Sequence, residues 1–210
     1  MNTSKNPALL LLAPFLLAAG PVMAVEEAEY RVVAEDGDFE VREYASAIIA
    51  EVVVDEDFED AGSSAFRALF KYIGGNNQEQ SDIAMTAPVS QQKQPVKIDM
   101  TSPVGQSETA EGWAVSFMMP ASFTMETIPE PLDPAVQIRE IPAHRAVSIS
   151  YSGTWSEERY TEHLQSLQTW LQENELEATG EPVWARYNAP FTPWFMRRNE
   201  ILIPVANVAG

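Results

Sequence analysis

The stretches that decide the fold are VREY at residues 41–44 and IREI at residues 138–141, two copies of one phrase. An apolar run follows each copy, at residues 47–54 in the first case and 146–151 in the second. Short runs rich in β-branched residues are typical of strands. Each run leads through an acidic loop into a segment with helical periodicity. The repeated order of strand, loop and helix predicts an internal duplication.

Two helices are predicted from apolar residues that recur at helical spacing. The first runs through Gly62, Phe66, Leu69, Phe70 and Ile73, and the second through Tyr160, Leu164, Leu167 and Leu171. Side-chain oxygens suited to cap a helix N-terminus precede both segments. We expect Asp60 or Ser63 to begin the first helix and Ser156 to begin the second.

A shorter repeat lies between the two units, IAMTAPV at residues 83–89 and IDMTSPV at residues 98–104. Alternation of apolar and other residues predicts a strand from each copy, with the prolines at strand ends or at a sheet edge. Further strands are expected at residues 113–119, 136–140, 183–187 and 200–205.

The fold class that follows is α+β, with two helices against about eight strands. Three prolines at positions 129, 131 and 134 mark a linker between halves at about residues 30–128 and 135–206. Strands of two similar strand–helix–strands halves that cannot cover their own apolar faces should close on one another. We therefore expect a distorted antiparallel β-barrel with both helices packed on its outside.

The N-terminal residues 1–24 have the layout of a secretory signal peptide. They contain one cation, Lys5, then an apolar run from Ala8 to Ala19 and small residues up to Ala24. That run is shorter than the roughly 20 residues needed to span a bilayer. We expect cleavage after Ala24, a single domain at residues 25–210 and no stable membrane insertion afterwards. The protein would be periplasmic in a Gram-negative cell and secreted otherwise.

Composition excludes several classes of function. The chain has no cysteine, which removes disulfides, thiolate metal sites, covalent c-type heme attachment and a cysteine nucleophile. A net charge of −18 argues against nucleic acid or an anionic membrane as partner. Neither histidine lies in a recognisable catalytic motif, and nucleophile-elbow, zinc-protease and phosphate-loop motifs are missing. We therefore expect a protein that binds and does not catalyse.

Four ordered phrases carry a resemblance to a known family. They are EVREY at 40–44, AFRALFKYI at 65–73, IAMTAPV at 83–89 with its second copy, and ARYNAPF at 185–191, followed by RRNE at 197–200. Over about residues 30–205 the chain resembles the SOUL family of heme-binding proteins. The resemblance implies a distorted barrel of two halves, akin to the effector-binding domains of some bacterial regulators. It also implies non-covalent binding of heme or a related tetrapyrrole, without enzymatic activity as a general property.

A heme site needs an apolar slot, cations for the two propionates and usually an axial donor. Arg67 and Lys71 lie four residues apart on the first predicted helix, beside apolar positions, and are suited to meet propionates. The alternative is that they belong to a solvated helix face. The predicted cofactor-binding residues are Phe66, Arg67, Leu69, Phe70, Lys71 and Met85.

Axial ligation is harder to assign. Some family members carry a histidine after the arginine of the opening phrase, where this chain has Glu43, so that ligand is not carried over. A carboxylate there is expected to pair with a neighbouring cation. The candidate metal ligands that remain are His163 and His144. The alternatives are that His144 is a turn or strand residue and that His163 borders the packing of the second helix on the barrel.

Methionine can also be an axial ligand, but for each methionine after residue 24 the favoured interpretation is a side chain that fills a gap in the core. The aromatic cluster at residues 191–195 is apolar enough to cover a ligand or to plug the end of the barrel, and we favour the plug. The predicted role is a carrier, buffer or scavenger of heme in the cell envelope. The alternative is a barrel that binds another apolar molecule or a protein partner, with heme binding incidental.

Overall fold

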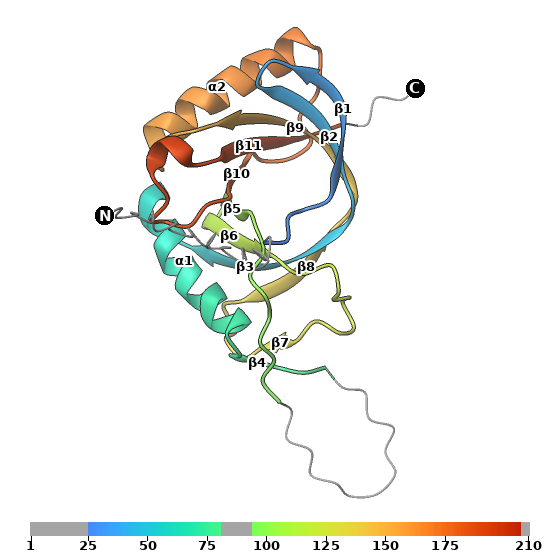
Figure 1. Ribbon diagram of the computed structural model, residues 1–210, viewed down its shortest axis with the longest axis vertical. Coiled ribbons are helices and arrows are strands. Elements are labelled where there is room, and N and C mark those ends of the chain that lie inside the picture. The colour runs from blue at the N-terminus through green and yellow to red at the C-terminus, as the bar shows by residue number, and fades with distance from the viewer. Residues whose placement is uncertain (1–24, 81–93, 207–210) are drawn as a thin grey trace, which may run out of the picture.

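The computed structural model describes residues 25–80 and 94–206 (Figure 1). The strands are β1 (Tyr30–Asp36), β2 (Phe39–Tyr44), β3 (Ala47–Val54), β4 (Asn77–Gln78), β5 (Val104–Thr109), β6 (Gly112–Met118), β7 (Glu130–Pro131), β8 (Gln137–Ile141), β9 (His144–Tyr151), β10 (Val183–Arg186) and β11 (Asn199–Val205). The helices are α1 (Phe58–Ile73), α2 (Glu157–Glu173) and the 3-10 helix η1 (Trp194–Met196). The predicted signal at residues 1–24 and the repeat copy at 83–89, with Met85, lie outside the described residues.

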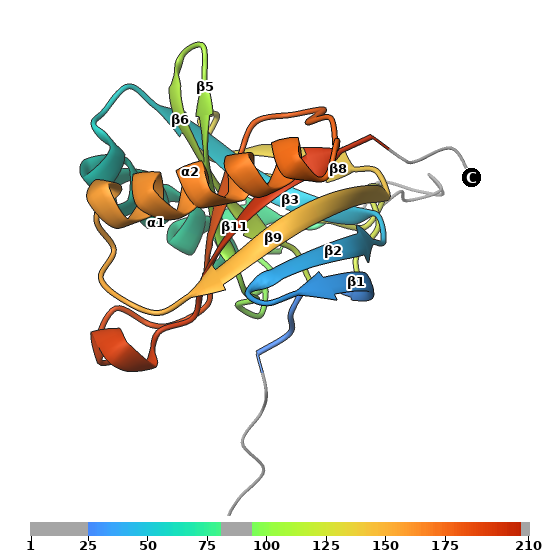
Figure 2. The same ribbon diagram turned by 90° about the horizontal axis from the view of Figure 1, so that it is seen from above.

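Nine strands form one antiparallel sheet in the order β1-β2-β9-β11-β10-β5-β6-β3-β8. The sheet curls into a half-barrel, as Figures 1 and 2 show from two directions. The α+β class and a barrel-like antiparallel sheet are therefore confirmed. The sheet is a half-barrel and not a closed one, because β1 and β8 do not pair with each other among the described strands. Both edges carry charged side chains, such as Arg139 on β8 and Arg31 on β1, and charge on an edge strand opposes further pairing.

Two series of four neighbouring strands can be followed inward through the sheet, one from β8 and one from β2. From one side the order is β8, β3, β6, β5, and from the other it is β2, β9, β11, β10. The repeated phrases at residues 41–44 and 138–141 lie in β2 and β8, which hold matching places in the two series. The internal duplication itself stays a prediction.

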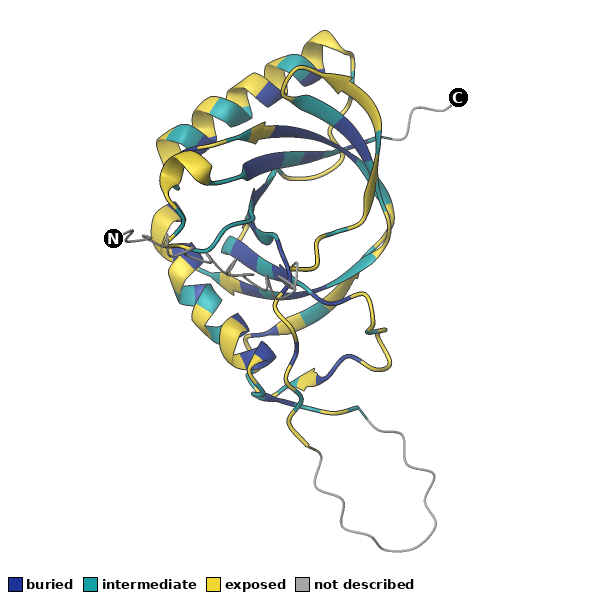
Figure 3. Ribbon diagram, viewed as in Figure 1, coloured by how far each residue is buried: buried dark blue, intermediate teal, exposed yellow. Residues whose placement is uncertain are grey.

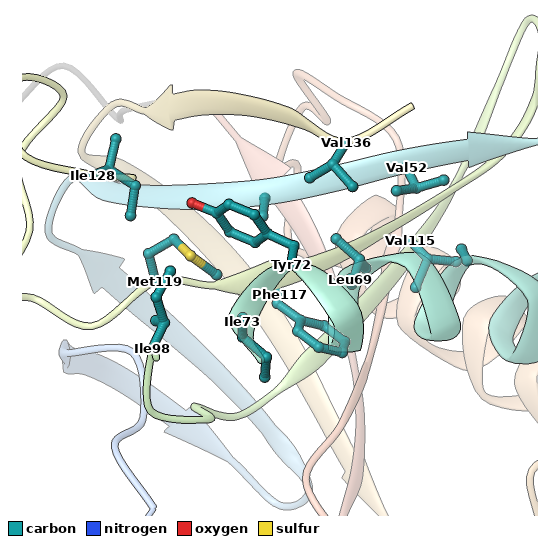
Figure 4. Packing of buried hydrophobic residues seen from close by; sticks show 12 residues of the cluster. Val52, Leu69, Tyr72, Ile73, Ile98, Val115, Phe117, Met119, Ile128 and Val136 are labelled. Atoms are coloured by element: carbon teal, nitrogen blue, oxygen red, sulfur yellow. The ribbon is translucent and has the colours of Figure 1, made fainter. Parts of the chain in front are cut away.

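Both helices cover the convex side of the sheet, as expected (Figure 2). Leu69 and Tyr72 of α1 are fully buried against Val52 of β3 and against Val115 and Phe117 of β6. Figure 4 shows how these side chains interlock. Full burial of a side chain such as Leu69 contributes about 1.5–3 kcal/mol. This cluster holds α1 in place.

The second helix is held by a separate apolar cluster. Leu167 and Leu171 of α2 pack against Val147 of β9 and Ile201 of β11. Trp184 of β10 is buried in the same cluster, where it stacks on Phe58 with 4.9 Å between ring centroids. Figure 3 shows that burial is concentrated in the strands that lie under the helices.

The helix N-termini were partly predictable. Ser156 caps α2 as expected, because its side-chain oxygen accepts a hydrogen bond from the backbone N–H of Arg159. The first helix begins earlier than expected, with Asp57 as its N-cap residue. Glu59 and Asp60 then occupy the first turn, where negative charge stabilises the helix dipole. None of the helices described is long and apolar enough to cross a membrane.

The strand expected at residues 98–104 is wrong, since β5 begins only at Val104. The backbone groups before it find partners outside the main sheet. The N–H of Ile98 donates to the carbonyl of Ile73 at 2.9 Å, and the N–H of Val96 donates to Oδ1 of Asn77 at 2.8 Å. Ile98 is thereby buried at the end of α1.

Candidate ligand-binding site

A cavity of about 590 Å³ lies on the concave side of the curled sheet. Successive side chains of a strand point to opposite faces. On β6, Val115 and Phe117 belong to the core under α1, whereas Ser116 and Met118 line the cavity. On β9, Val147 packs under α2 and Ala146 lines the cavity. One sheet thus separates the apolar core from the hollow.

The hollow exists because the residues that line its floor are small. Gly105, Ser116, Ala146 and Ala185 come from four different strands and all border the cavity. A Cβ atom placed on Gly105 would lie 2.7 Å from Oγ of Ser116, so the backbone and that hydroxyl are already in close contact. Glycine in a strand commonly marks such a close approach.

The wall of the cavity is mostly apolar. Met118, Met119, Phe123 and Met125 form one side, and Leu202 of β11 contributes from the other. Cavities of roughly 300–1,000 Å³ with predominantly apolar walls and a few polar groups are typical small-molecule sites. The volume of this one lies within that range.

One histidine belongs to the lining. His144, the first residue of β9, stacks on Tyr44 with 5.3 Å between ring centroids and 12° between ring planes. Its Nδ1 lies 3.0 Å from the carbonyl oxygen of Pro142. A carbonyl only accepts, so Nδ1 carries the hydrogen and the neutral ring keeps its lone pair on Nε2. Nε2 makes no hydrogen bond to the described residues, which leaves a potential metal-ligating atom beside the cavity.

A buried ionic network holds Tyr44 from behind. Nη1 of Arg42 donates to the hydroxyl of Tyr44 at 3.1 Å and to Oε2 of Glu200 at 2.7 Å. Glu200 also accepts from Tyr187 at 2.8 Å and from Arg198 at 2.9 Å. Charge-assisted bonds of this length are stronger than neutral ones. The network therefore fixes the ring on which His144 stacks.

These contacts shift the titration of the groups involved. Burial raises the pKa of Glu200, but the hydrogen bond from Arg42 and the charges of Arg42 and Arg198 outweigh burial and lower it below its ordinary value. Burial raises the pKa of Tyr44 to about 12 despite the opposing charge of Arg42. Glu200 is thus ionised and Tyr44 neutral near pH 7.

The residues predicted on the first helix lie away from this cavity. Leu69 is fully buried in the core, and Phe66 is partly buried against Phe117, with 5.1 Å between ring centroids. Arg67, Phe70 and Lys71 are exposed on the outer surface of α1. The structure thus brings Phe66 and Leu69 into the core and leaves the two cations in solvent. Their role in cofactor binding stays a prediction, as does that of Met85.

The expected ion pair of Glu43 is confirmed, and His163 lies where its alternative interpretation placed it, while its role as a metal ligand stays a prediction. Glu43 pairs with Arg145 at 2.7 Å and with Arg31, as expected of a carboxylate at that position. The hydrogen bonds from Arg145 and Arg31 lower the pKa of Glu43. His163 stacks on Tyr151 of β9 with 3.8 Å between ring centroids, so it borders the packing of α2 on the sheet. It does not line the cavity.

The aromatic cluster at residues 191–195 does not plug the sheet, and that expectation is wrong. Phe191 is 90% exposed, Trp194 59% and Phe195 61%. Trp184, by contrast, is buried under the helices.

Charge at the cavity is one-sided. The glutamates that line it are Glu26, Glu27, Glu29, Glu126 and Glu140. Glu27 is paired with Arg198 at 2.9 Å. Of the described residues, neither a lysine nor an arginine lines the cavity. An apolar ring system with an iron-binding centre therefore fits this lining, while acidic substituents on it find no cation there.

Fold and cavity together define a class of protein in which a curled antiparallel sheet carries two helices outside and a ligand-sized hollow inside. The chain belongs to the SOUL heme-binding protein family, whose model matches residues 25–204. It is 27% identical over 165 residues to Heme-binding protein 1 of Xenopus tropicalis, covering 78% of this chain and 81% of that protein. It is 28% identical over 169 residues to Heme-binding protein 1 of Mus musculus, covering 80% and 84%.

Solved structures share the fold at low identity. The EcmrR C-terminal domain aligns with a TM-score of 0.51 and 16% identity, covering 85% of this chain and 99% of that domain. A structure from Listeria innocua described as a hydrolase aligns with a TM-score of 0.50 and 13% identity, covering 83% and 94%. At these identities the likeness shows the fold alone.

Proposed function

We propose that this protein binds heme or a related tetrapyrrole non-covalently in the concave cavity. The observation that carries the proposal is the hollow of about 590 Å³, with its small-residue floor and the His144 imidazole in its lining. Membership of the SOUL family and the names of the vertebrate relatives support heme as the ligand.

The described lining suits the apolar macrocycle of heme better than its two propionates. A bound heme supplies an iron centre that takes axial ligands. Nε2 of His144 is the nitrogen placed to serve, with Nδ1 held by Pro142 and the ring by Tyr44. The lining offers the propionates no cation. Apolar contact with residues such as Met118 and Leu202 therefore provides most of the binding free energy in this proposal.

The proposed setting is the cell envelope, where the protein carries, buffers or scavenges its ligand without catalysis. This part of the proposal rests on the signal-like residues 1–24 and on the lack of a catalytic motif in the sequence. The family is one of binding proteins, which agrees with it.

A second candidate ligand follows from the glutamates around the cavity. Five carboxylates and no cation in the described lining favour a neutral or cationic apolar molecule over an anionic one. In this alternative heme binding is incidental.

A hemin titration followed by the Soret band tests the main proposal. Ser116→Phe places a ring inside the cavity, and Val53→Phe, on neighbouring β3 but outside the lining, is the matched control. We expect saturable one-to-one binding that Ser116→Phe weakens at least about tenfold, or 1.4 kcal/mol, and that Val53→Phe leaves unchanged.

Two outcomes contradict the cavity as the heme site. If Ser116→Phe binds normally while Arg67→Gln/Lys71→Gln loses affinity, the ligand is held by α1. Hemin binding that never saturates is the second such outcome. If a neutral naphthylamine dye then binds one-to-one to the wild type and not to Ser116→Phe, the ligand is a neutral or cationic apolar molecule.

A further inference from the structure

The segment between β10 and β11 exposes large apolar side chains that the cavity does not use. We call residues 190–197 the aromatic loop. Its exposed side chains are Phe191 (90%), Trp194 (59%), Phe195 (61%) and Met196 (65%). The loop, with the red turn of η1, projects from the body of the molecule in Figure 2 and is coloured as exposed in Figure 3. A cluster of exposed apolar side chains of this kind marks an interaction site.

The backbone of the loop is held in place. The side chain of Arg197 donates from Nε to the carbonyl of Thr192 at 2.8 Å and from Nη2 to that of Pro190 at 2.7 Å. Its guanidinium also lies 4.3 Å from the ring centroid of Trp155. The N–H of Gly153 donates to the carbonyl of Trp194 at 3.1 Å, which ties the loop to the end of β9. The apolar side chains are therefore presented outward by a fixed frame.

The charge of this region differs from that of the rest of the chain. Residues 187–199 contain two arginines and no aspartate or glutamate, in a chain with 31 acidic and 13 basic residues. Arg198 is paired with Glu27 and Glu200. Arg197 pairs with no carboxylate of the described residues. Residues 190–197 therefore bring no carboxylate of their own to a polar surface.

Two occupants suit an exposed aromatic tip, a second copy of the chain and a lipid surface. A stable protein–protein interface takes roughly 20–30 residues a side. Four side chains at the end of a projecting loop are too few, and two strongly acidic copies repel each other. Tryptophan is a residue that settles at the membrane–water interface, and phenylalanine is common in helices that lie there. The observations therefore favour lipid.

We propose that the aromatic loop docks this protein on a zwitterionic lipid surface, with Phe191, Trp194 and Phe195 entering the interfacial layer. The net charge of −18 disfavours an anionic bilayer at long range, while the loop itself brings no carboxylate to the headgroup phosphates at short range. The docking is peripheral and reversible, because so few side chains enter. It does not depend on which molecule occupies the cavity.

Tryptophan quenching by vesicles of brominated phosphatidylcholine tests this proposal on the chain that begins at Val25. The expected signal is left out because its apolar run at residues 8–19 would bind vesicles by itself. We expect quenching in the wild type and its loss in Phe191→Ser/Phe195→Ser, with binding weakened at least tenfold. Trp194→Phe should still sediment with the vesicles but show much less quenching. Leu132→Ser, at a position 56% exposed elsewhere on the surface, should behave as wild type.

The outcomes separate the two occupants. Equal quenching in the wild type and the double variant overturns the proposal. Sedimentation that shows a micromolar dimer, dissolved by the double variant, assigns the loop to a second copy and also overturns it. Anionic phosphatidylglycerol added to the vesicles should weaken binding, and stronger binding would contradict the zwitterionic preference. Thermal unfolding of each variant should match the wild type, since the substituted side chains are exposed.

Discussion

Arg42 of β2 and Glu200 of β11 are 158 positions apart in sequence and form a two-point ion pair inside the sheet. Nη1 lies 2.7 Å from Oε2 and Nη2 lies 3.1 Å from Oε1. Neither side chain is more than 2% exposed. Because β9 lies between β2 and β11, the pair clamps three strands together.

Removing one partner of this pair should destabilise the fold strongly. Breaking a buried ion pair by removal of one partner costs about 3–5 kcal/mol. Glu200 keeps Arg198 and Tyr187 as partners in Arg42→Met, so we expect a loss of unfolding free energy at the low end of that range, about 3 kcal/mol. Arg139→Met is the matched control. This variant breaks the ion pair with Glu51. Because the Arg139 side chain is 52% exposed, the free energy of unfolding should fall by less than about 1 kcal/mol. Urea unfolding measures the free energy of unfolding of both variants. Equal losses would show that the buried ion pair stabilises the fold no more than the exposed one does.

Stability should depend on pH through Glu200. The pKa of this carboxyl is lowered from 4.5 in the folded protein, so the unfolded chain binds more protons below that pH. The stabilisation is complete above the ordinary carboxyl range and is lost as pH falls through the folded pKa. Glu200→Gln should show a shallower loss of unfolding free energy between about pH 5 and pH 2. An identical slope in wild type and variant would remove Glu200 from the explanation.

The two histidines should respond differently to hemin. His144 borders the cavity, whereas His163 lies between α2 and β9. His144→Ala should therefore shift the Soret maximum of the hemin complex and weaken binding several-fold, while His163→Ala leaves both unchanged. If both spectra stay unchanged, His144 is not the axial ligand, and Met118 and Met125 are the next candidates in the lining.

Hemin affinity should be nearly independent of salt. Without a cation in the described lining, the propionates form no ion pair for salt to screen. Raising sodium chloride from about 50 to about 500 mM should change the dissociation constant less than about threefold. A site on α1 built from Arg67 and Lys71 would lose much more. A steep fall in affinity with salt would thus favour the helix over the cavity.

Local sequence signals predicted the elements well where chemistry is local. The run at residues 47–54 is β3 itself, because β-branched residues in a short apolar stretch form a buried strand. Ser156 caps α2 because its hydroxyl reaches a free backbone N–H. Sheet closure could not be predicted in this way, since it depends on whether β1 and β8, far apart in the chain, meet at their edges.

The site was hidden for a related reason. Gly105, Ala146 and Ala185 form a floor only after β5, β9 and β10 are brought into one sheet, and no one of these residues is distinctive in sequence. On β9 the alternation of Ala146 with the larger Val147 was a visible hint, as small residues in register on one face leave space. The apolar character of Phe191 and Trp194 suggested burial, yet the frame built by Arg197 holds them outward.

The single sheet between core and hollow divides the work of the molecule. Strand side chains that pack under the helices, such as Val115 and Val147, point one way, and those that line the cavity, such as Ser116 and Ala146, point the other. Residues on the inner face can therefore be exchanged during evolution and change the ligand specificity, while the outer face keeps the chain folded. The bound ligand can therefore change among related proteins while the fold stays the same.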